Sequence, residues 1–153
     1  MREPENDQNY VFTAVSLLAN RLQAAGDQVT GSITFKQWLV LLIVREMPVG
    51  SSITEIAQQQ GNSRQNTMKL LRELSRQNYI QIRRAESDKR SYAVFITKEG
   101  TALMKRISQP GGDFIRALFG GVSPADIASM RRVMTRLFLN LDSLTDNLRG
   151  KLP

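Results

Sequence analysis

The segment RRAESDKRSYAVFIT, residues 83–97, has the pattern of the tip and second strand of a β-hairpin. SYAVFIT alternates and is rich in β-branched and aromatic residues, as is YIQIRR at residues 79–84, and the AESDKR between them has the polar composition of a tip. Asp88 interrupts this cationic run two residues before Arg90. The sequence therefore predicts two short strands joined by a polar tip, a hairpin whose cations are Arg83, Arg84, Lys89 and Arg90.

Two short helical segments precede the hairpin. Ser52 or Thr54 can cap the first, SSITEIAQQQ, and Gly61 can end it. Asn62 or Ser63 can cap the second, which has cations and amides opposite a stripe of residues suited to burial. That stripe consists of Thr67, Leu70, Leu71 and Leu74. Two helices joined by so short a turn predict a helix-turn-helix unit.

Longer helical segments flank this unit. Apolar residues at helical spacing predict a first helix over about residues 8–26, and a capping box at Thr34 opens a second. Thr97 can cap a helix that PGG at residues 110–112 should interrupt, and Ser123 opens the last one. The sequence therefore predicts an α+β, mostly α fold, in which a winged helix-turn-helix lies between helical flanks.

The expected domain organisation is simple. All 153 residues should form one domain with a core of ordinary size, since 41% of them are hydrophobic. Within it, a DNA-binding lobe is expected over about residues 33–98. The flanks, about residues 8–26 and 99–148, should form a dimerisation lobe.

The composition excludes several classes of function. The chain has no cysteine and no histidine, so disulfides, thiolate zinc sites and cysteine nucleophiles are excluded. The commonest general base and the commonest metal ligand are missing as well. We therefore expect a protein that is not an enzyme and that uses no cofactor and no metal.

The net charge of +7 is concentrated in one part of the chain. Residues 62–106 contain 11 Lys and Arg against 4 Asp and Glu, whereas the other residues hold 10 of each sign. This concentration favours a nucleic-acid-binding face more strongly than a high pI spread over the surface does. A solvated face that happens to be basic explains the charge alone equally well.

The motifs around the hairpin resemble those of a known family. DKRSYAVFITKEG, residues 88–100, is similar to the wing signature of the MarR family of bacterial transcriptional regulators: Asp-x-Arg, a β-branched and an aliphatic residue, then Thr and Gly. TFKQW, ITEIAQQQG and LLRELSRQNYIQIRR add to a resemblance that covers residues 8–148. PGG at residues 110–112 departs from it, because many relatives keep a longer unbroken helix there.

A helix-turn-helix docked in the major groove reads bases with the first turns of its second helix. The candidates for this role are Ser63, Arg64, Gln65, Asn66 and Lys69. Arg72 and Arg76, further along, either contact phosphates or stay in solvent. The resemblance implies that Arg90 enters the minor groove. Asp88 lies on the same side of an extended chain and can hold the Arg90 guanidinium, although a surface ion pair without a role is the alternative.

The resemblance also implies a homodimer that binds a pseudopalindromic operator, as a repressor that a small ligand releases. Apolar residues in the first and last predicted helices exceed what a small winged helix buries, although packing within one chain is an alternative. Two-fold symmetry then predicts half-sites about 10 bp apart. An aromatic or anionic organic effector is expected between the dimer helices and the DNA-binding lobe. Its candidate wall residues, which suit a core equally well, are Phe35, Trp38, Arg45 and Met47.

The polar N-terminus and the lack of a long apolar run predict a cytoplasmic, nucleoid-associated protein without a membrane segment. The leading hypothesis is therefore a sequence-specific transcriptional regulator that binds double-stranded DNA. An architectural or plasmid-maintenance protein, using the same fold without a ligand, is the alternative. A winged helix that only binds other proteins is a third.

Overall fold

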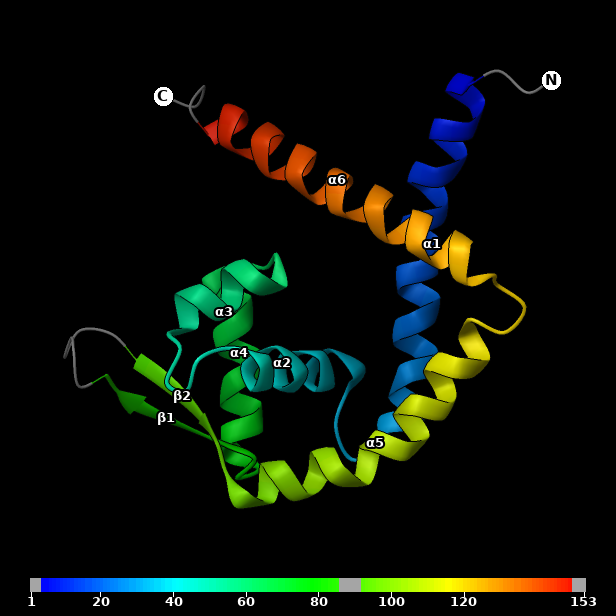
Figure 1. Ribbon diagram of the computed structural model, residues 1–153. Coiled ribbons are helices and arrows are strands. Elements are labelled where there is room, and N and C mark those ends of the chain that lie inside the picture. Colours follow the sequence, from blue (N-terminus) through cyan, green and yellow to red (C-terminus); the bar gives the residue numbers. More distant parts are fainter. Residues whose placement is uncertain (1–3, 86–91, 150–153) are drawn as a thin grey trace. The chain divides into compact units, whose positions relative to one another are not determined.

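The computed structural model describes residues 4–85 and 92–149 (Figure 1). In this part of the chain, six helices accompany a two-stranded antiparallel sheet. The elements are α1 (Pro4–Thr30), α2 (Phe35–Glu46), α3 (Ile53–Gln60), α4 (Arg64–Arg76), β1 (Ile80–Arg84), β2 (Tyr92–Ile96), α5 (Lys98–Leu118) and α6 (Pro124–Arg149). Their order and content confirm the predicted mostly α winged helix-turn-helix with helical flanks.

Two compact units make up the chain, residues 1–114 and residues 115–153. The first unit contains α1 to β2 and most of α5, and its hydrophobic core joins α2, α3, α4, the hairpin and the start of α5. The largest fully buried side chains of this core are Leu41, Ile53, Ile56, Leu71, Leu74, Ile80 and Leu103. The predicted burial stripe of α4 is confirmed at Thr67, Leu71 and Leu74, while Leu70 is half-buried.

Side-chain caps fix where the helices of the first unit begin. Thr34 forms the predicted capping box: its hydroxyl accepts from the backbone N–H of Gln37 at 3.2 Å, and its own N–H donates to the Gln37 side chain at 2.8 Å. Of the two residues proposed to cap α3, Ser52 does so, with Glu55 as its partner. The backbone N–H of Ser52 and then its hydroxyl lower the pKa of Glu55. Gly61 ends α3 in the left-handed conformation, at φ 66°.

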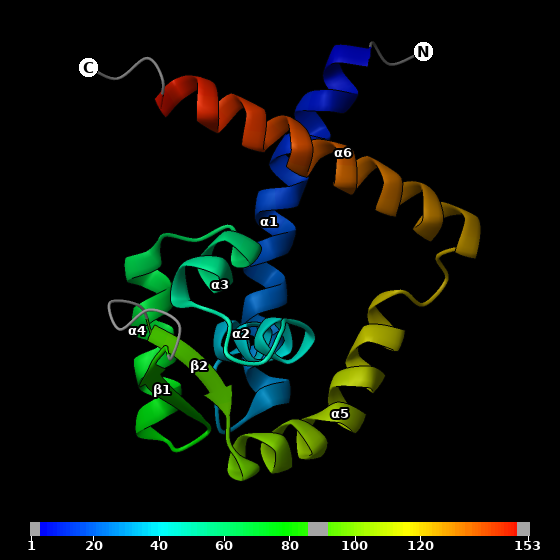
Figure 2. The ribbon, with the colours of Figure 1, turned by 60° about the vertical axis from the view of Figure 1, so that its left-hand side comes forward.

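The hairpin pairs through its backbone with the segment that begins α3 (Figure 2). Ile82 lies opposite Val94 in the antiparallel register of β1 and β2. On the other edge of β2, the N–H of Val94 donates to the carbonyl of Ser51 at 3.1 Å, and Ser52 forms a bridge with Ala93. The outer edge of β2 therefore has backbone partners in the segment that leads into α3.

The predicted end of the first helix near Gly26 is wrong, because α1 continues to Thr30. Gly26 is buried inside this helix, and a Cβ added to it would overlap the ring of Phe35. The glycine therefore permits a close approach of α1 and the start of α2 instead of ending the helix. The hydroxyl of Thr30 donates to the carbonyl of Ile33, at the turn that follows.

The predicted break at Pro110, Gly111 and Gly112 is also wrong, because α5 runs through these residues and includes DFIRAL as well. Gly111 is buried against Trp38 of α2, and a Cβ added to it would lie 2.8 Å from Cζ2 of the indole. This close packing against α2 favours helix at a position where local propensity disfavours it.

The second unit contains the end of α5 and α6, which Ser123 caps as predicted, its hydroxyl accepting from the N–H of Asp126 at 3.1 Å. One side of α6 carries an apolar row with alternating spacings of three and four residues. This row, called the α6 seam below, consists of Ile127, Met130, Met134, Leu137, Leu141 and Leu144. No helix among the described residues is long and apolar enough to cross a bilayer.

Candidate nucleic-acid interface

The first turns of α4 present the predicted base-reading residues together. The hydroxyl of Ser63 caps the helix by accepting from the N–H of Asn66 at 3.2 Å. The five predicted residues are all exposed, and a hollow runs along the same side of the helix. Its lining consists of Arg64, Gln65, Asn66, Met68, Lys69, Arg72, Glu73 and Arg76. The opposite side of α4 is buried, so the exposed side is free to meet a ligand.

Contacts with α3 hold α4 in place beneath this exposed side. Thr67 is fully buried, and its hydroxyl donates to the side-chain oxygen of Gln60, at the end of α3, at 3.1 Å. Leu71 and Leu74 continue the buried side into the common core. These contacts fix the orientation in which α4 offers its polar side to the outside.

The two arginines in the second half of α4 differ in their surroundings. Arg76 pairs with the carboxylate of Glu73 at 2.6 Å, and this carboxylate also accepts from Gln77 at 3.2 Å. Arg72 is exposed and lines the hollow. Arg76 is thus engaged on its own helix, which leaves Arg72 as the better candidate for an anionic ligand.

The described part of the wing holds Arg83 by two contacts. Its guanidinium carbon lies 5.4 Å from the centroid of the Phe95 ring, and its Nη2 donates to the side-chain oxygen of Gln81. Arg84 is exposed on the same strand. The predicted roles of Asp88, Lys89 and Arg90 fall outside the described residues.

Phe95 and Gln81 were not predicted as part of the site. The strand register places them opposite each other, and Arg83 lies two residues from Gln81 on the same face of β1. Phe95 is thus the diagonal cross-strand neighbour of Arg83. This contact can be predicted from the sequence only when the register of the hairpin is known. Phe95 therefore adds a positioning residue for a predicted cation.

The four candidate ligand-pocket residues lie at the two ends of α2. Trp38 is buried in the core, with its ring 5.7 Å from that of Phe35 and tilted by 58°. Arg45 and Met47 follow Trp38 further along the chain, about 10 and about 14 Å away along the helix axis at a rise of 1.5 Å per residue. Arg45 is exposed and pairs with Glu46 at 2.8 Å, and Met47 is half-buried. A ligand pocket at these residues stays a prediction.

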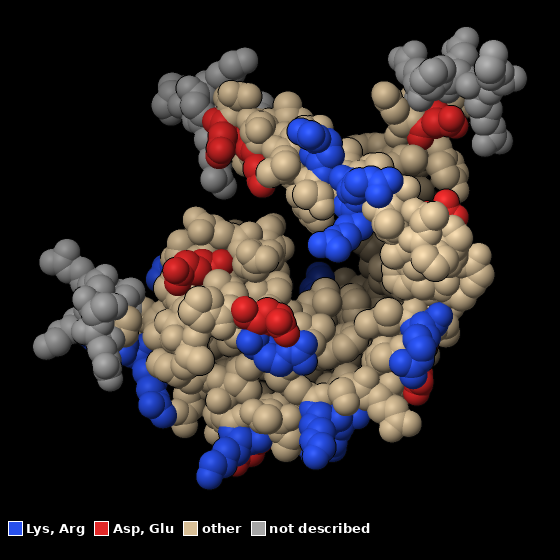
Figure 3. Space-filling model, in the orientation of Figure 1, with Lys and Arg blue, Asp and Glu red and all other residues tan. Residues whose placement is uncertain are grey.

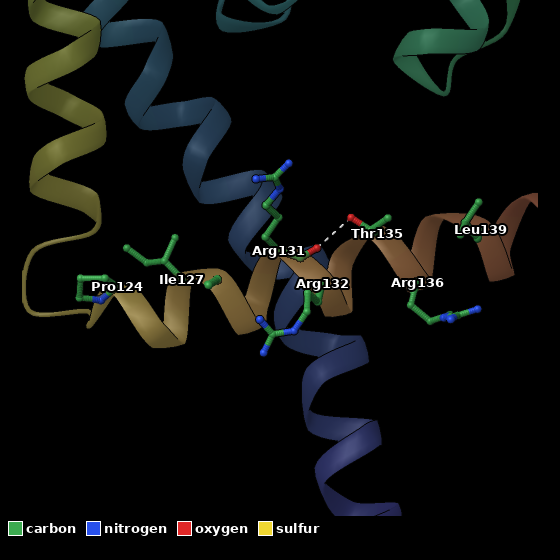
Figure 4. A pocket seen from close by; sticks show the side chains of 8 residues that line it. Pro124, Ile127, Arg131, Arg132, Thr135, Arg136 and Leu139 are labelled. Atoms are coloured by element: carbon green, nitrogen blue, oxygen red, sulfur yellow. Dashed lines mark hydrogen bonds between the residues drawn. The ribbon is translucent and has the colours of Figure 1, made fainter.

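A second cationic hollow lies along α6 (Figure 4). Leu139 contributes to it from the side of the helix that faces away from the α6 seam, and Thr135 donates to the carbonyl of Arg131 at 2.9 Å within it. Its other lining residues are Pro124, Ile127, Ala128, Arg132 and Arg136. In Figure 3, blue side chains gather on the N-terminal half of α6 and red ones near its C-terminal end. In the part of the chain that the structure describes, no cluster of acidic side chains could hold a metal ion.

Comparison with known proteins finds a similarity to one family. The sequence model of the MarR family matches residues 32–91, from the turn before α2 to the residue before β2. Over these residues the chain is similar to the MarR family of transcriptional regulators. The transcriptional activatory protein BadR of Rhodopseudomonas palustris is 28% identical over 151 residues, which cover 94% of this chain and 85% of BadR.

Solved structures of MarR proteins share the fold. A MarR/EmrR family regulator from Acinetobacter sp. ADP1 matches with a TM-score of 0.80 at 18% identity, covering 89% of this chain and 97% of its own. A MarR protein from Peptoclostridium difficile matches with a TM-score of 0.81 at 16% identity, covering 90% and 91%. These likenesses show the fold, in which α4 is the second helix of the helix-turn-helix and β1–β2 form the wing.

Proposed function

We propose that this MarR-family chain acts as a homodimer that binds a pseudopalindromic site on double-stranded DNA and thereby regulates transcription at the nucleoid. The observation that carries the proposal is the exposed side of α4, where Arg64, Gln65, Asn66 and Lys69 lie together. Arginine and lysine donate to guanine, and Gln or Asn pairs with adenine, so this set can read base edges in a major groove. Ser63 begins the helix and can add a contact to a phosphate or a base.

The wing and the second half of α4 supply contacts with the DNA backbone in this proposal. Arg72 on α4 and Arg83 and Arg84 on β1 are exposed cations. Contacts of this kind set the register of a protein on the duplex and carry the salt dependence of binding. By the family resemblance, Arg90 enters the minor groove with Asp88 as its support and Lys89 beside it.

Replacing Phe95 by leucine is expected to weaken DNA binding about two- to fivefold, because a cation–π contact at an exposed site is worth about 0.5–1 kcal/mol. Leucine keeps the apolar bulk of the strand but removes the ring under Arg83. Fluorescence anisotropy with a labelled duplex measures the change. Tyr92→Leu, an aromatic residue on the same strand and opposite Arg84, is the matched control and should bind like the wild type. Equal DNA affinities of the two variants would show that Phe95 does not position Arg83 for binding.

The homodimer is proposed because α1 and α6 each expose apolar residues. On α1, Phe12 is 79% exposed and Leu17 is 55% exposed, and on α6 the α6 seam includes Leu141 and Leu144 at 59% each. A row spaced alternately by three and four residues is the pattern with which a helix packs against another helix. A second copy of the chain would cover these surfaces. Two-fold symmetry would then place the two copies of α4 in major grooves about 10 bp apart.

Replacing Leu141 by aspartate is expected to convert the dimer to a monomer at micromolar concentrations, because an unpaired charge would be buried in the α6 seam. Light scattering after size-exclusion chromatography measures the mass. Leu139→Asp is the matched control, since Leu139 is 55% exposed, lies on the same helix and is not part of the α6 seam. A dimer that persists in Leu141→Asp and dissociates in Leu139→Asp would place the interface on the other side of α6.

The direction of regulation has two candidates. Repression with release by an aromatic or anionic organic ligand is the prediction from the sequence. Activation is supported by the relative BadR, which is named a transcriptional activatory protein. Transcription in vitro from the chain's own target promoter separates them, since a repressor lowers the amount of transcript and an activator raises it.

Footprinting combined with competition tests the proposed function. The wild-type protein should protect two half-sites with two-fold symmetry, and a random duplex should compete poorly for it. Relief of binding by an aromatic or anionic small molecule would support a ligand-controlled regulator. Equal affinity for all duplexes would instead favour the architectural or plasmid-maintenance alternative. Absence of DNA binding at low salt would overturn both.

A further inference from the structure

A groove of about 460 Å³ lies between the start of α2 and the exposed side of α4. Lys36 and Gln37 line it from α2, beside the cap residue Thr34. From the region of α4 come Asn62, Asn66, Lys69, Leu70 and Glu73. Asn66, Lys69 and Glu73 also line the hollow along α4, so the groove continues the proposed base-reading surface towards α2.

The groove is cationic. Lys36 and Lys69 are both exposed and approach it from different helices. Glu73 is the single carboxylate in its lining, and this carboxylate is already engaged by Arg76 at 2.6 Å and by Gln77 at 3.2 Å. The charge that the groove offers to a ligand is therefore that of its two lysines.

The position of Lys36 is unfavourable for the helix that carries it. The N-terminal end of a helix dipole is positive and favours acidic residues in the first turn. The first turns of α3, α5 and α6 each carry an acid, namely Glu55, Glu99 and Asp126. The first turns of α2 and α4 carry none, and they hold Lys36 and Arg64 instead. These two turns are the ones that border the proposed DNA surface, which indicates that their cations serve binding and not helix stability.

Lys36 has no structural task that explains this placement. The capping box of Thr34 and Gln37 already satisfies the start of α2 without it. Within the described residues, Lys36 forms no ion pair or side-chain hydrogen bond. A cation without an intramolecular partner, beside a second such cation on the recognition helix, is suited to a polyanion.

We propose that this groove receives the phosphate backbone of the DNA strand that borders the major groove occupied by α4, with Lys36 as a phosphate-binding residue. The inference rests on the proposed function and extends the interface from α4 and the wing to α2. A phosphate contact adds affinity without sequence information, whereas the base-reading residues of α4 add both. Lys36 should therefore act equally on all duplexes.

The experiment compares Lys36→Gln with the matched control Lys105→Gln, which removes an exposed lysine from the middle of α5. Affinity is measured against salt concentration for two probes: a duplex that the wild type selects from a random library, and a mixed-sequence duplex. For Lys36→Gln, the slope of log affinity against log salt should fall by about 0.9 for each protomer, on both probes. The preference between the probes should stay the same, and the melting temperature should not fall.

The outcomes separate this inference from the proposed function. If the wild type selects no duplex, the proposed function fails. If the wild type selects a duplex but Lys36→Gln and Lys105→Gln show the same slope of log affinity against log salt, the phosphate contact at α2 is overturned and the proposed function stands. A loss of binding that accompanies a lower melting temperature would also overturn it, because a structural role would then explain the loss. Lys36→Glu gives a second reading, with a larger loss expected on both probes.

Discussion

Replacing Gly100 by alanine is expected to destabilise the first unit by about 3 kcal/mol, at the upper end of the usual cost of overpacking. Gly100 is buried in the first turn of α5, and an added Cβ would overlap the carbonyl oxygen of Tyr79 and lie 3.0 Å from Cγ2 of Ile96. That carbonyl belongs to the backbone and accepts from the N–H of Thr97 at 3.1 Å, so it cannot move without loss of this bond. The midpoint of urea unfolding should fall.

Thr101→Ala is the matched control for this prediction, because it places an alanine in the same turn at an exposed position. It removes the hydrogen bond from the Thr101 hydroxyl to the carbonyl of Thr97, and should change the stability by at most about 0.5 kcal/mol. Equal unfolding midpoints for Gly100→Ala and the wild type would show that α5 can shift away from the hairpin at little cost.

Replacing Arg64 by alanine is expected to weaken operator binding by a factor of about 5 to 150, if the arginine makes a bidentate contact with guanine worth about 1–3 kcal/mol. Arg64 is the first residue of α4, exposed, and part of the proposed base-reading surface. The loss should be larger for the operator than for a random duplex, because a base contact contributes to sequence preference. Competition titrations with both duplexes measure the two affinities.

Arg76→Ala provides the comparison, since it removes the same side chain and the same charge from the same helix. Arg76 lies at the other end of α4 and is engaged by Glu73, so its loss should change the affinity by less than about threefold, as for a weak exposed ion pair. If Arg76→Ala lowered the sequence preference more than Arg64→Ala, the C-terminal half of α4 would be the part that reads bases.

Much of the fold could be predicted because its signals are local. Thr34, Ser52, Ser63 and Ser123 each begin a helix as caps, and each uses its own hydroxyl to accept from an N–H three residues on. The hairpin also follows from a local pattern, since its strands alternate and its tip is polar. Such signals involve residues a few positions apart, so the sequence displays them directly.

The two errors in the fold both concern glycines whose role depends on distant residues. Gly26 was predicted to end α1 and Gly111 to help break α5, yet both are buried inside helices against the rings of Phe35 and Trp38. Local propensity treats such a glycine as a weak point of the helix. Close packing of one helix on another reverses this preference, and no sequence pattern near the glycine indicates it.

In the candidate site, too, the residues that were predicted carry a local signal and those that were missed depend on distant residues. The exposed cations and amides of α4 were predicted because helical periodicity assigns each residue to a side of the helix. Phe95 and Lys36 were missed, since the role proposed for each involves another element: Phe95 contacts Arg83 on the neighbouring strand, and Lys36 lines a groove shared with α4. Their relation to the site needs the register of the hairpin and the packing of α2 on α4.

The bond between Val94 and Ser51 has a consequence for the thermodynamics of recognition. Through this bond and the bridge of Ser52 with Ala93, the wing is joined to α3, and Thr67 joins α3 to α4 through Gln60. The wing and α4 should therefore bind DNA as one rigid unit. Binding of the duplex by either element then raises the effective concentration of the other at the duplex. The losses of DNA-binding free energy caused by substitutions in the wing and in α4 should then be non-additive, because a substitution in one element also weakens the contribution of the other.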